Sequence, residues 1–266
     1  MSRYERAFAA LRARRETAFI PFAVAGDPDL RTSERVLRTM VDSGADVLEI
    51  GYPFSDPIAD GPVNQRAAAR AIAAGLDQAR FFGLVRRIRA ATDIPIGVLI
   101  YANSVLHYGA ERFCREAARA GIDSLLVADM PPEESGDLSR AMRSAGLARV
   151  FIVSELTPSR RMAAICSQVD AFVYVVSRLG PTGVGRRMSA TVGSTLARLR
   201  RVTDRPLCVG FGLSKPEHVA AARRAGADGA IVGSALVAQV EALRDRPAAM
   251  LRRIGRMVAE LKAATR

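Results

Sequence analysis

Glu49 is the residue whose type and position point most clearly to chemistry. It lies near the carboxyl end of a run of apolar residues, 45–51, that is typical of a buried strand. Because side chains alternate along a strand, Leu48 and Ile50 are predicted to face the helices and Glu49 to point into the mouth of the barrel. Burial raises the pKa of a carboxyl group, so Glu49 is predicted to exchange protons near neutral pH. The alternative is a structural glutamate whose carboxylate accepts hydrogen bonds from backbone donors.

The segment that follows this strand carries two further carboxylates, Asp56 and Asp60. Pro53, Pro57 and Pro62 restrict the backbone of the segment, which is long enough to fold over a ligand. Asp60 is therefore a candidate for contact with a substrate. Its alternative role is that of a turn former or of a cap for the helix predicted to begin at Pro62.

Glycine-containing turns after the last three predicted strands form a third candidate site. They are residues 178–183 (Arg-Leu-Gly-Pro-Thr-Gly), Phe211-Gly212 and Gly233-Ser234, and Ser234 is placed to cap the next helix. In (β/α)8 barrels, backbone N–H groups of these turns and the N-terminus of a short helix often bind phosphate. One such turn is weak evidence, because glycine also serves barrel corners, but three in succession predict a phosphate site.

Other ways to cleave or form a carbon–carbon bond fit the sequence less well. A Schiff base needs a lysine inside the domain, but Lys215 falls in a late loop or helix start and Lys262 in the last predicted helix. His107 and His218 stand alone, so no metal site is expected. The sequence also lacks a cofactor motif. These considerations leave carboxylate acid–base chemistry on a phosphorylated substrate.

The elements that must position these residues alternate regularly along the chain. Strands are predicted at residues 18–25, 45–51, 95–101, 124–128, 149–153, 171–177, 206–210 and 229–232. Helices are predicted at 32–43, 62–73, 110–120, 132–145, 159–168, 189–202, 216–225 and 248–263. Nearly continuous apolar strands are typical of a parallel sheet that is covered on both faces. Eight such units predict an α/β fold, a single (β/α)8 barrel domain over residues 1–266.

Two features at the N-terminus bear on this prediction. An open doubly wound sheet usually has a G-x-G-x-x-G turn after its first strand, whereas the turn here, 25–29, reads Ala-Gly-Asp-Pro-Asp. Tyr4, Phe8 and Leu11 have helical spacing, which predicts a helix that caps the amino end of the barrel. The alternative for this arginine-rich segment is a transit peptide, but the acidic residues Glu5 and Glu16 argue against it.

Composition limits the class of protein. Apolar residues make up 49% of the chain, which excludes intrinsic disorder, and the longest apolar runs, 18–26 and 94–102, are about half of a membrane span. No segment near Met1 resembles a signal peptide, so a soluble, cytoplasmic protein is expected. The three cysteines are widely spaced, so we expect reduced thiols.

The formal net charge of +12 raises the question of an anionic partner. A nucleic-acid site would need clustered basic residues, but the arginines are spread in ones and twos along the predicted helices. A solvated basic surface is therefore predicted, with neither a nucleic-acid nor a membrane partner. The alternative is that the positive field attracts an anion, and a small phosphorylated substrate would profit from it.

Specific motifs extend over nearly the whole chain. They are Phe19-Ile-Pro-Phe22, Ala25-Gly-Asp-Pro28, Leu48-Glu-Ile-Gly51, Pro53-Phe-Ser-Asp-Pro57, Ala59-Asp-Gly-Pro62, Tyr101-Ala-Asn103, Val127-Ala-Asp129, Ser177-Arg178, Thr182-Gly183, Gly210-Phe-Gly212 and Gly233-Ser234. In these motifs the sequence resembles the family of tryptophan synthase α subunits, which are (β/α)8 barrels. The resemblance implies retro-aldol cleavage of indole-3-glycerol phosphate to indole and glyceraldehyde 3-phosphate without a cofactor. It also implies an α2β2 complex in which indole passes to a β subunit that carries pyridoxal phosphate.

The resemblance also implies roles for individual residues. Glu49 matches the acid–base glutamate that protonates the indole ring carbon and helps to deprotonate the side-chain hydroxyl. Asp60 matches the aspartate that accepts a hydrogen bond from the indole N–H, and Thr182 matches the contact of a mobile loop with Asp60. The indole pocket is implied at Phe22, Leu99, Tyr101, Leu126, Ala128, Tyr174 and Phe211. The phosphate site is implied at Gly183, Gly212, Gly233 and Ser234, and contacts to the β subunit at Pro53, Phe54, Asp56 and Asn103.

Some positions depart from the family pattern, chiefly Tyr52, Asn64, Glu155 and Pro181. None of them removes a chemical group from the implied mechanism. We expect these departures to affect loop closure, coupling to the β subunit and the identity of the substrate. A stand-alone indole-3-glycerol-phosphate lyase or a specialised paralogue is therefore an alternative. A basic, anion-binding barrel without enzymatic activity is a further one, although it would not account for Glu49 and Asp60.

Overall fold

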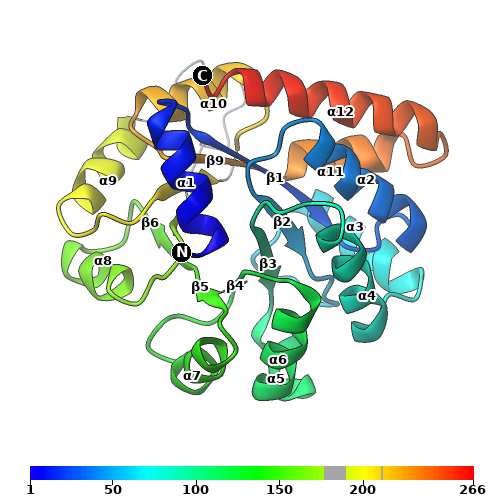
Figure 1. The fold of residues 1–266 in the computed structure, drawn as a ribbon, viewed down its shortest axis with the longest axis horizontal. Helices are drawn as coiled ribbons and strands as arrows, with labels where there is room; N and C mark the ends of the chain where they lie inside the picture. The colour runs from blue at the N-terminus through cyan, green and yellow to red at the C-terminus, as the bar shows by residue number, and fades with distance from the viewer. Residues whose placement is uncertain (177–189, 211) are drawn as a thin grey trace.

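A parallel sheet that closes on itself forms the centre of the molecule. The computed structural model describes residues 1–176, 190–210 and 212–266. In this part of the chain, nine strands form one sheet in the order β5-β4-β3-β2-β1-β9-β8-β7-β6. The two edge strands, β5 (Ala148–Arg149) and β6 (Phe151–Ser154), are separated in sequence by Val150, so a single segment closes the ring. The predicted (β/α)8 barrel is confirmed, and Figure 1 shows its helices arranged around the strands.

The remaining strands fall within the predicted ranges. They are β1 (Ala18–Val24), β2 (Leu48–Gly51), β3 (Ile96–Ile100), β4 (Ser124–Val127), β7 (Val173–Val176), β8 (Leu207–Gly210) and β9 (Gly229–Val232). The prediction of one unbroken fifth strand, 149–153, is wrong. At Val150 the chain changes partner, because β5 pairs with β4 whereas β6 pairs with β7. Residue 177, the last of the sixth predicted strand, lies outside the described residues.

Twelve helices lie in the described part of the chain. Their bounds are α1 (Arg3–Ala13), α2 (Leu30–Asp42), α3 (Pro62–Ala73), α4 (Gln78–Arg89), α5 (Ala102–Tyr108), α6 (Ala110–Ala120), α7 (Gly136–Ser144), α8 (Ser159–Cys166), α9 (Ala190–Arg200), α10 (Pro216–Arg224), α11 (Ser234–Ala242) and α12 (Pro247–Ala263). Helices α4, α5 and α11 are not among the helices predicted from the sequence. The start predicted for α7 at Pro132 is wrong, because Pro132 and Ser135 form a turn before the helix.

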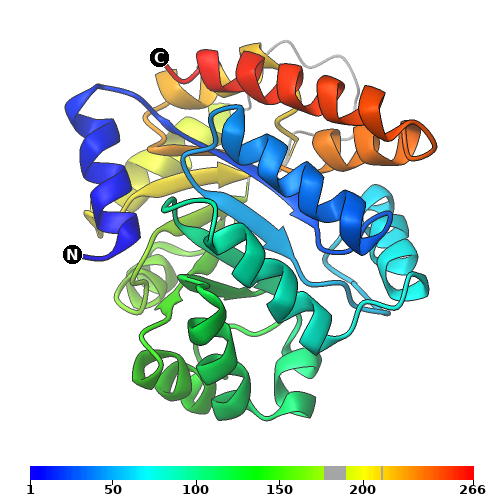
Figure 2. The same cartoon turned by 45° about the vertical axis from the view of Figure 1, so that its right-hand side comes forward.

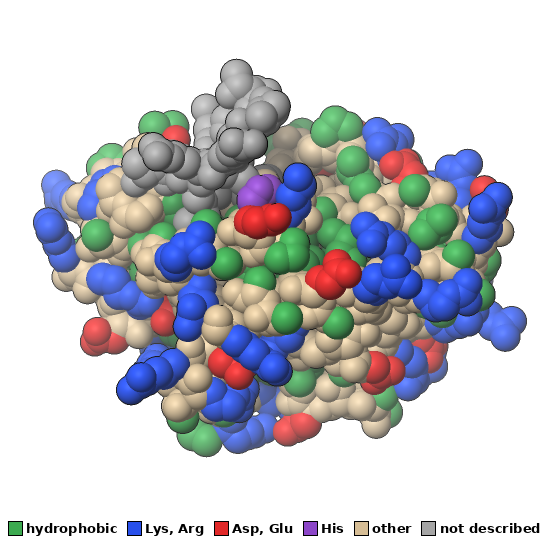
Figure 3. Space-filling view, turned by 90° about the horizontal axis from the view of Figure 1, so that it is seen from above, with side chains coloured by type: hydrophobic (Ala, Val, Ile, Leu, Met, Phe, Trp, Pro, Cys, Tyr) green, Lys and Arg blue, Asp and Glu red, His purple; other side chains and the backbone are tan. Residues whose placement is uncertain are grey.

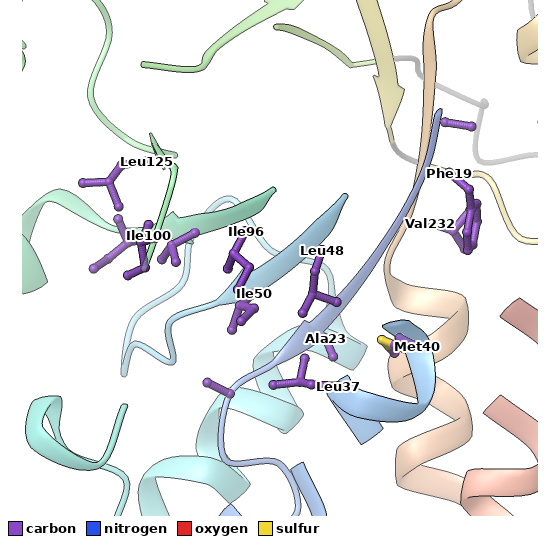
Figure 4. Packing of buried hydrophobic residues seen from close by; sticks show 14 of the residues in the cluster. Phe19, Ala23, Leu37, Met40, Leu48, Ile50, Ile96, Ile100, Leu125 and Val232 are labelled. Atoms are coloured by element: carbon purple, nitrogen blue, oxygen red, sulfur yellow. The ribbon is translucent and has the colours of Figure 1, made fainter. Parts of the chain in front are cut away.

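The core has an outer layer between the strands and the helices. Leu48 and Ile50 belong to this layer, which confirms the predicted outward orientation of both side chains. Figure 4 shows Leu37 and Met40 of α2 near Ala23 of β1 and Leu48 of β2. Because the odd positions of β2 point the other way, Glu49 faces the interior of the barrel.

Helix α1 closes the amino end of the barrel, as predicted. Its apolar side chains Tyr4, Phe8 and Leu11 belong to a second cluster, which fills the interior of the ring. The cluster also contains Ile20, Val47, Leu126, Val150 and Phe172. The Tyr4 hydroxyl forms a buried hydrogen bond with Ser124 Oγ, at 2.7 Å. In Figure 2, α1 lies at the end of the barrel from which the strand arrows point away.

On the face seen in Figure 3, charged side chains are distributed rather than gathered in one patch. Figure 3 shows Lys and Arg side chains around the visible face, with acidic side chains between them. Many of the arginines have acidic partners, for example Arg87 with Glu34 and Arg66 with Glu241. The described part of the chain contains no helix that is long and apolar enough to cross a membrane.

Candidate active site

Glu49 is buried, and among the described residues it has no hydrogen-bond donor. It lies at the centre of β2, opposite Phe22 of β1 and Gly97 of β3 in the ladder, and is 4% exposed. No described residue donates a hydrogen bond to its carboxylate, so the structural alternative, in which backbone donors satisfy the group, is not observed. Burial, with a smaller contribution from the negative charge of Asp60, raises the pKa of Glu49 to about 8. The carboxyl group therefore holds its proton at neutral pH, and a small increase in pH is enough to remove it.

A cavity at the carboxyl ends of the strands joins Glu49 to the other candidate residues. Its wall contains the following residues: Phe22, Glu49, Asp60, Gly61, Asn64, Leu99, Tyr174, Gly212, Leu213, Ile231, Gly233 and Ser234. Strand β2 can pass close to the aromatic wall because Gly51 has no side chain. A Cβ atom at Gly51 would lie 2.6 Å from Cζ of Phe22. The cavity thus combines two carboxyl groups, apolar walls and glycine-rich backbone in one space.

Asp60 receives hydrogen bonds on both carboxylate oxygens. The amide Nδ2 of Asn64 donates to Oδ1 at 3.2 Å, and the hydroxyl of Tyr101 donates to Oδ2 at 3.0 Å. The N–H of Ala59 in turn donates to the Tyr101 hydroxyl, at 3.1 Å. Gly61, not Asp60, occupies the N-cap position of α3, so the alternative role of Asp60 as a helix cap is wrong. The carboxylate is instead fixed in orientation at the edge of the cavity.

Asn64 was not among the predicted site residues, although it lies one helical turn from Asp60. Its Oδ1 atom is buried and has no hydrogen-bond partner within the described part of the chain. A flipped amide would place Oδ1 against the Asp60 carboxylate, so the orientation with Nδ2 toward Asp60 is the favourable one. Asn64 lies four residues after Asp60, in the first turn of the helix predicted at 62–73. This spacing was the signal that could have identified it.

Tyr101 supports Asp60 rather than lining the cavity. Its side chain is buried, and its ring stacks on Phe54 with centroids 5.1 Å apart. Burial and the neighbouring Asp60 raise the pKa of the Tyr101 phenol, which therefore remains a hydrogen-bond donor. A continuous contact thus runs from Phe54 through Tyr101 to Asp60.

Not every predicted pocket residue lies at the cavity. Phe22, Leu99 and Tyr174 line it, together with Leu213 and Ile231, which were not predicted. Leu126 is buried deeper in the barrel, in a narrow space below Glu49. Ala128 lines a separate hollow near Asp129 and Leu156. The predicted residues Thr182, Gly183 and Phe211 lie outside the described residues, as does Pro181.

Another part of the cavity wall contains backbone near the start of α11. Gly212 has a φ of +75°, a conformation that favours glycine. Gly233 occupies the N-cap of α11 without a side-chain cap, so the expectation that Ser234 caps this helix is wrong. The first turn of a helix has N–H groups without partners inside the helix and carries a positive partial charge. This part of the cavity can therefore bind an anion such as phosphate.

The segments that follow the strands at the mouth of the barrel expose apolar side chains. Ile58, Leu106 and Leu156, which we call the apolar rim, are 84%, 55% and 74% exposed and follow β2, β3 and β6, respectively. Asp56, in the loop after β2, and Asn103, in α5, are also exposed, whereas Phe54 is half-buried and Pro53 is buried. Because the carboxyl ends of parallel strands meet at one end of a barrel, these side chains surround the cavity.

Comparison with known proteins gives consistent matches over the whole chain. A family model described as tryptophan synthase alpha chain matches residues 8–266. A tryptophan synthase alpha chain from Methanothermobacter thermautotrophicus is 46% identical over 248 residues, which are 93% of this chain and 92% of that protein. One from Methanoregula boonei is 44% identical and covers 99% of this chain and 98% of that protein. The structure of the tryptophan synthase alpha subunit from Legionella pneumophila superposes with a TM-score of 0.90 at 32% identity, over 100% of this chain and 98% of that one.

Burial of Glu49 predicts a specific dependence of stability on pH. The unfolded chain ionises this group near its ordinary pKa of 4.5, whereas the folded chain ionises it near 8. Between these values the folded state binds more protons, so the contribution of Glu49 to stability falls as pH rises. Glu49→Gln should therefore stabilise the fold increasingly from pH 5 to pH 9, by as much as about 4 kcal/mol at about 1.4 kcal/mol for each pKa unit.

Urea unfolding of both proteins across this pH range measures the effect. Glu134→Gln, a change at an exposed glutamate, is the control, and its effect should vary by less than about 0.5 kcal/mol. A difference between Glu49→Gln and wild type that stays constant with pH would mean that Glu49 has the same pKa in both states.

Proposed function

The chain belongs to the tryptophan synthase alpha chain family, and from this premise we propose that Glu49 and Asp60 are the residues with which it cleaves indole-3-glycerol phosphate. The observation that carries the proposal is the pair of carboxyl groups in one cavity with opposite surroundings. Glu49 is desolvated and receives no hydrogen bond from a described residue, whereas Asp60 accepts two. Environments that differ in this way divide acid and base roles between two carboxyl groups.

In the proposed reaction, Glu49 acts on the bond between the indole ring and the glycerol chain. The protonated carboxyl gives its proton to the ring carbon that carries the chain, which places positive charge on the indole. The resulting Glu49 carboxylate helps to remove the proton of the hydroxyl on the adjacent carbon. The carbon–carbon bond then breaks, its electron pair returns to the ring to restore indole, and the hydroxyl carbon becomes the aldehyde of glyceraldehyde 3-phosphate. Glu49 ends the cycle protonated.

Asp60 is the proposed partner of the indole N–H group. Its carboxylate is fixed by Asn64 and Tyr101, so its position does not have to be organised during the reaction. A fixed negative charge beside the ring nitrogen stabilises the positive charge that appears when the ring carbon is protonated. Phe22, Leu99 and Tyr174 provide apolar surface for the ring. The phosphate lies, in this proposal, against the backbone of Gly212 and Gly233 and the N-terminus of α11.

The proposed partner is a tryptophan synthase β subunit, in an α2β2 complex, with pyridoxal phosphate in the β subunit. The apolar rim supports this proposal, because three large exposed apolar side chains at one end of the barrel favour burial in an interface. The predicted contacts Phe54, Asp56 and Asn103 lie in the same segments, the loop after β2 and helix α5. Since Phe54 stacks on Tyr101, which binds Asp60, docking at this surface would bear directly on the catalytic site.

Incubation of the purified chain with indole-3-glycerol phosphate tests the activity. Wild type should release indole and glyceraldehyde 3-phosphate, and Glu49→Gln should lower kcat by roughly 100- to 10,000-fold because the amide cannot transfer a proton. Binding of the substrate by Glu49→Gln should remain within about threefold, since the shape of the side chain is kept. Unchanged turnover in this variant would remove Glu49 from the mechanism, and no product from wild type, with or without a β subunit, would overturn the proposed activity.

Phosphate binding should depend on the backbone of the late loops. A Cβ atom at Gly233 would lie 3.2 Å from Cδ1 of Phe22, so Gly233→Leu should crowd the N-terminus of α11 and weaken the binding of glycerol 3-phosphate about tenfold or more. Arg86→Gln removes an exposed charge from α4, in the outer ring of helices, and should change this affinity by less than about twofold. The reverse order in a calorimetric titration would indicate a diffuse electrostatic site.

The partner surface is tested by replacing one residue of the apolar rim. Ile58→Asp should weaken association with a β subunit about tenfold or more, because it places a charge in a desolvated contact. Ile72→Asp, at an exposed residue near the end of α3, is the matched control and should leave the association unchanged. Analytical ultracentrifugation at micromolar concentrations measures both. Full activity alone and no complex would establish a stand-alone lyase.

A further inference from the structure

Four charged side chains, which we call the ionic clamp, join three walls of the cavity on its outer side. They are Asp27, in the loop after β1, Arg66 and Arg70 of α3, and Glu241 of α11. Arg70 binds both oxygens of Asp27, through Nε at 2.7 Å and Nη2 at 3.0 Å, and donates from Nη1 to Glu241 at 2.8 Å. Arg66 donates to both oxygens of Glu241, at 2.7 and 2.8 Å.

The geometry and burial of the clamp make it rigid. Two of its contacts are bidentate pairs between a guanidinium group and a carboxylate, which fix orientation as well as distance. The side chains of Asp27, Arg70 and Glu241 are 2%, 19% and 23% exposed, so water competes weakly for them, whereas Arg66 is 54% exposed and forms the outer end of the clamp. The hydrogen bonds from Arg66 and then from Arg70 lower the pKa of Glu241 to about 2. Glu241 is therefore ionised throughout the physiological range.

The helices that the clamp joins both begin at the cavity, one beside Asp60 and the other at the proposed phosphate site. Helix α3 starts at Pro62, two residues after Asp60, and α11 starts at Ser234, in the proposed phosphate site. Between them Ala67, Ala71 and the partly buried Val63 of α3 pack in one cluster with Val237 of α11. This packing is apolar and not directional, so the bidentate contacts of the clamp add the interactions that fix the position of α3 along α11.

We propose that the ionic clamp is a positioning device that sets the separation between the Asp60 end and the phosphate end of the cavity. This inference rests on the proposed function, because it assigns one part of the substrate to each end. With the separation fixed, a ligand that carries both an indole ring and a phosphate engages both ends at once. Binding energy gained by the phosphate is then available to hold the ring against Glu49.

Loss of the clamp should therefore uncouple the two ends without removing either. Helix α3 could then settle at more than one position along α11, and a ligand that spans the cavity would have to select one of them. A ligand that occupies only one end would not be affected. This difference separates a positioning role from a general contribution to stability.

Binding titrations of the purified chain with three probes test the proposal. The probes are indole, glycerol 3-phosphate, and an indole joined to a phosphate by a propyl chain, which spans the cavity without reacting. In Glu241→Gln, affinity for the spanning probe should fall about tenfold or more, while affinities for indole and for glycerol 3-phosphate stay within about twofold. Arg66→Lys keeps the charge but not the bidentate contact and should give a smaller loss in the same direction.

Glu34→Gln is the matched control. Glu34 also accepts from two arginines, Arg38 and Arg87, and its side chain is 21% exposed, but it joins α2 to α4. This variant should lose thermal stability to a similar extent and bind all three probes as wild type does. Equal losses for the single-ended and spanning probes in Glu241→Gln, or no loss for either, would overturn the positioning role. A wild-type protein that binds the spanning probe no better than its parts would instead contradict the proposed substrate.

Discussion

Burial of one carboxyl group inside the barrel is the constraint on which the rest of the structure depends. Glu49 has no compensating donor among the described residues, so the folded state accepts a group that water would solvate better. The barrel must hold this position against the tendency of the group to ionise and become hydrated. Packing does so from below, where Tyr4 of α1 and Ser124 close the interior by a buried hydrogen bond. The outward side chains of β2, Leu48 and Ile50, anchor the strand to the helices.

The second carboxyl group, that of Asp60, has surroundings opposite to those of Glu49. Asp60 lies on a loop at the mouth and is supported on both oxygens, by Asn64 from α3 and by Tyr101 from the end of β3. A buried acid that retains its proton and an oriented carboxylate that accepts hydrogen bonds can act on two sides of one ring. The contact of Tyr101 with Phe54 extends this arrangement to the surface that we propose for binding a partner. The proposed chemistry and the proposed docking surface therefore share side chains.

Local patterns were sufficient to predict the barrel and the inward orientation of Glu49, because strand alternation is a property of adjacent residues. They were not sufficient for α5, a helix of seven residues that is too short to show a period. The break at Val150 depends on which strands flank the segment, which its own sequence does not specify. Tyr101 was expected in the wall of the pocket, but its hydroxyl reaches Asp60, 41 positions away. Contacts between residues so far apart in the sequence arise when the barrel closes, and the spacing of neighbouring residues does not predict them.

The central claim is that Glu49 holds a proton at neutral pH because the barrel desolvates it. Infrared spectroscopy of the ligand-free protein measures this directly, through the carbonyl stretch of a protonated carboxylic acid that is present in wild type and absent from Glu49→Gln. Recorded from about pH 5 to about pH 10, this band should persist through pH 7 and disappear with a midpoint near pH 8. A band that is already lost at about pH 5 would show that the buried carboxyl is ionised under working conditions and would contradict the account.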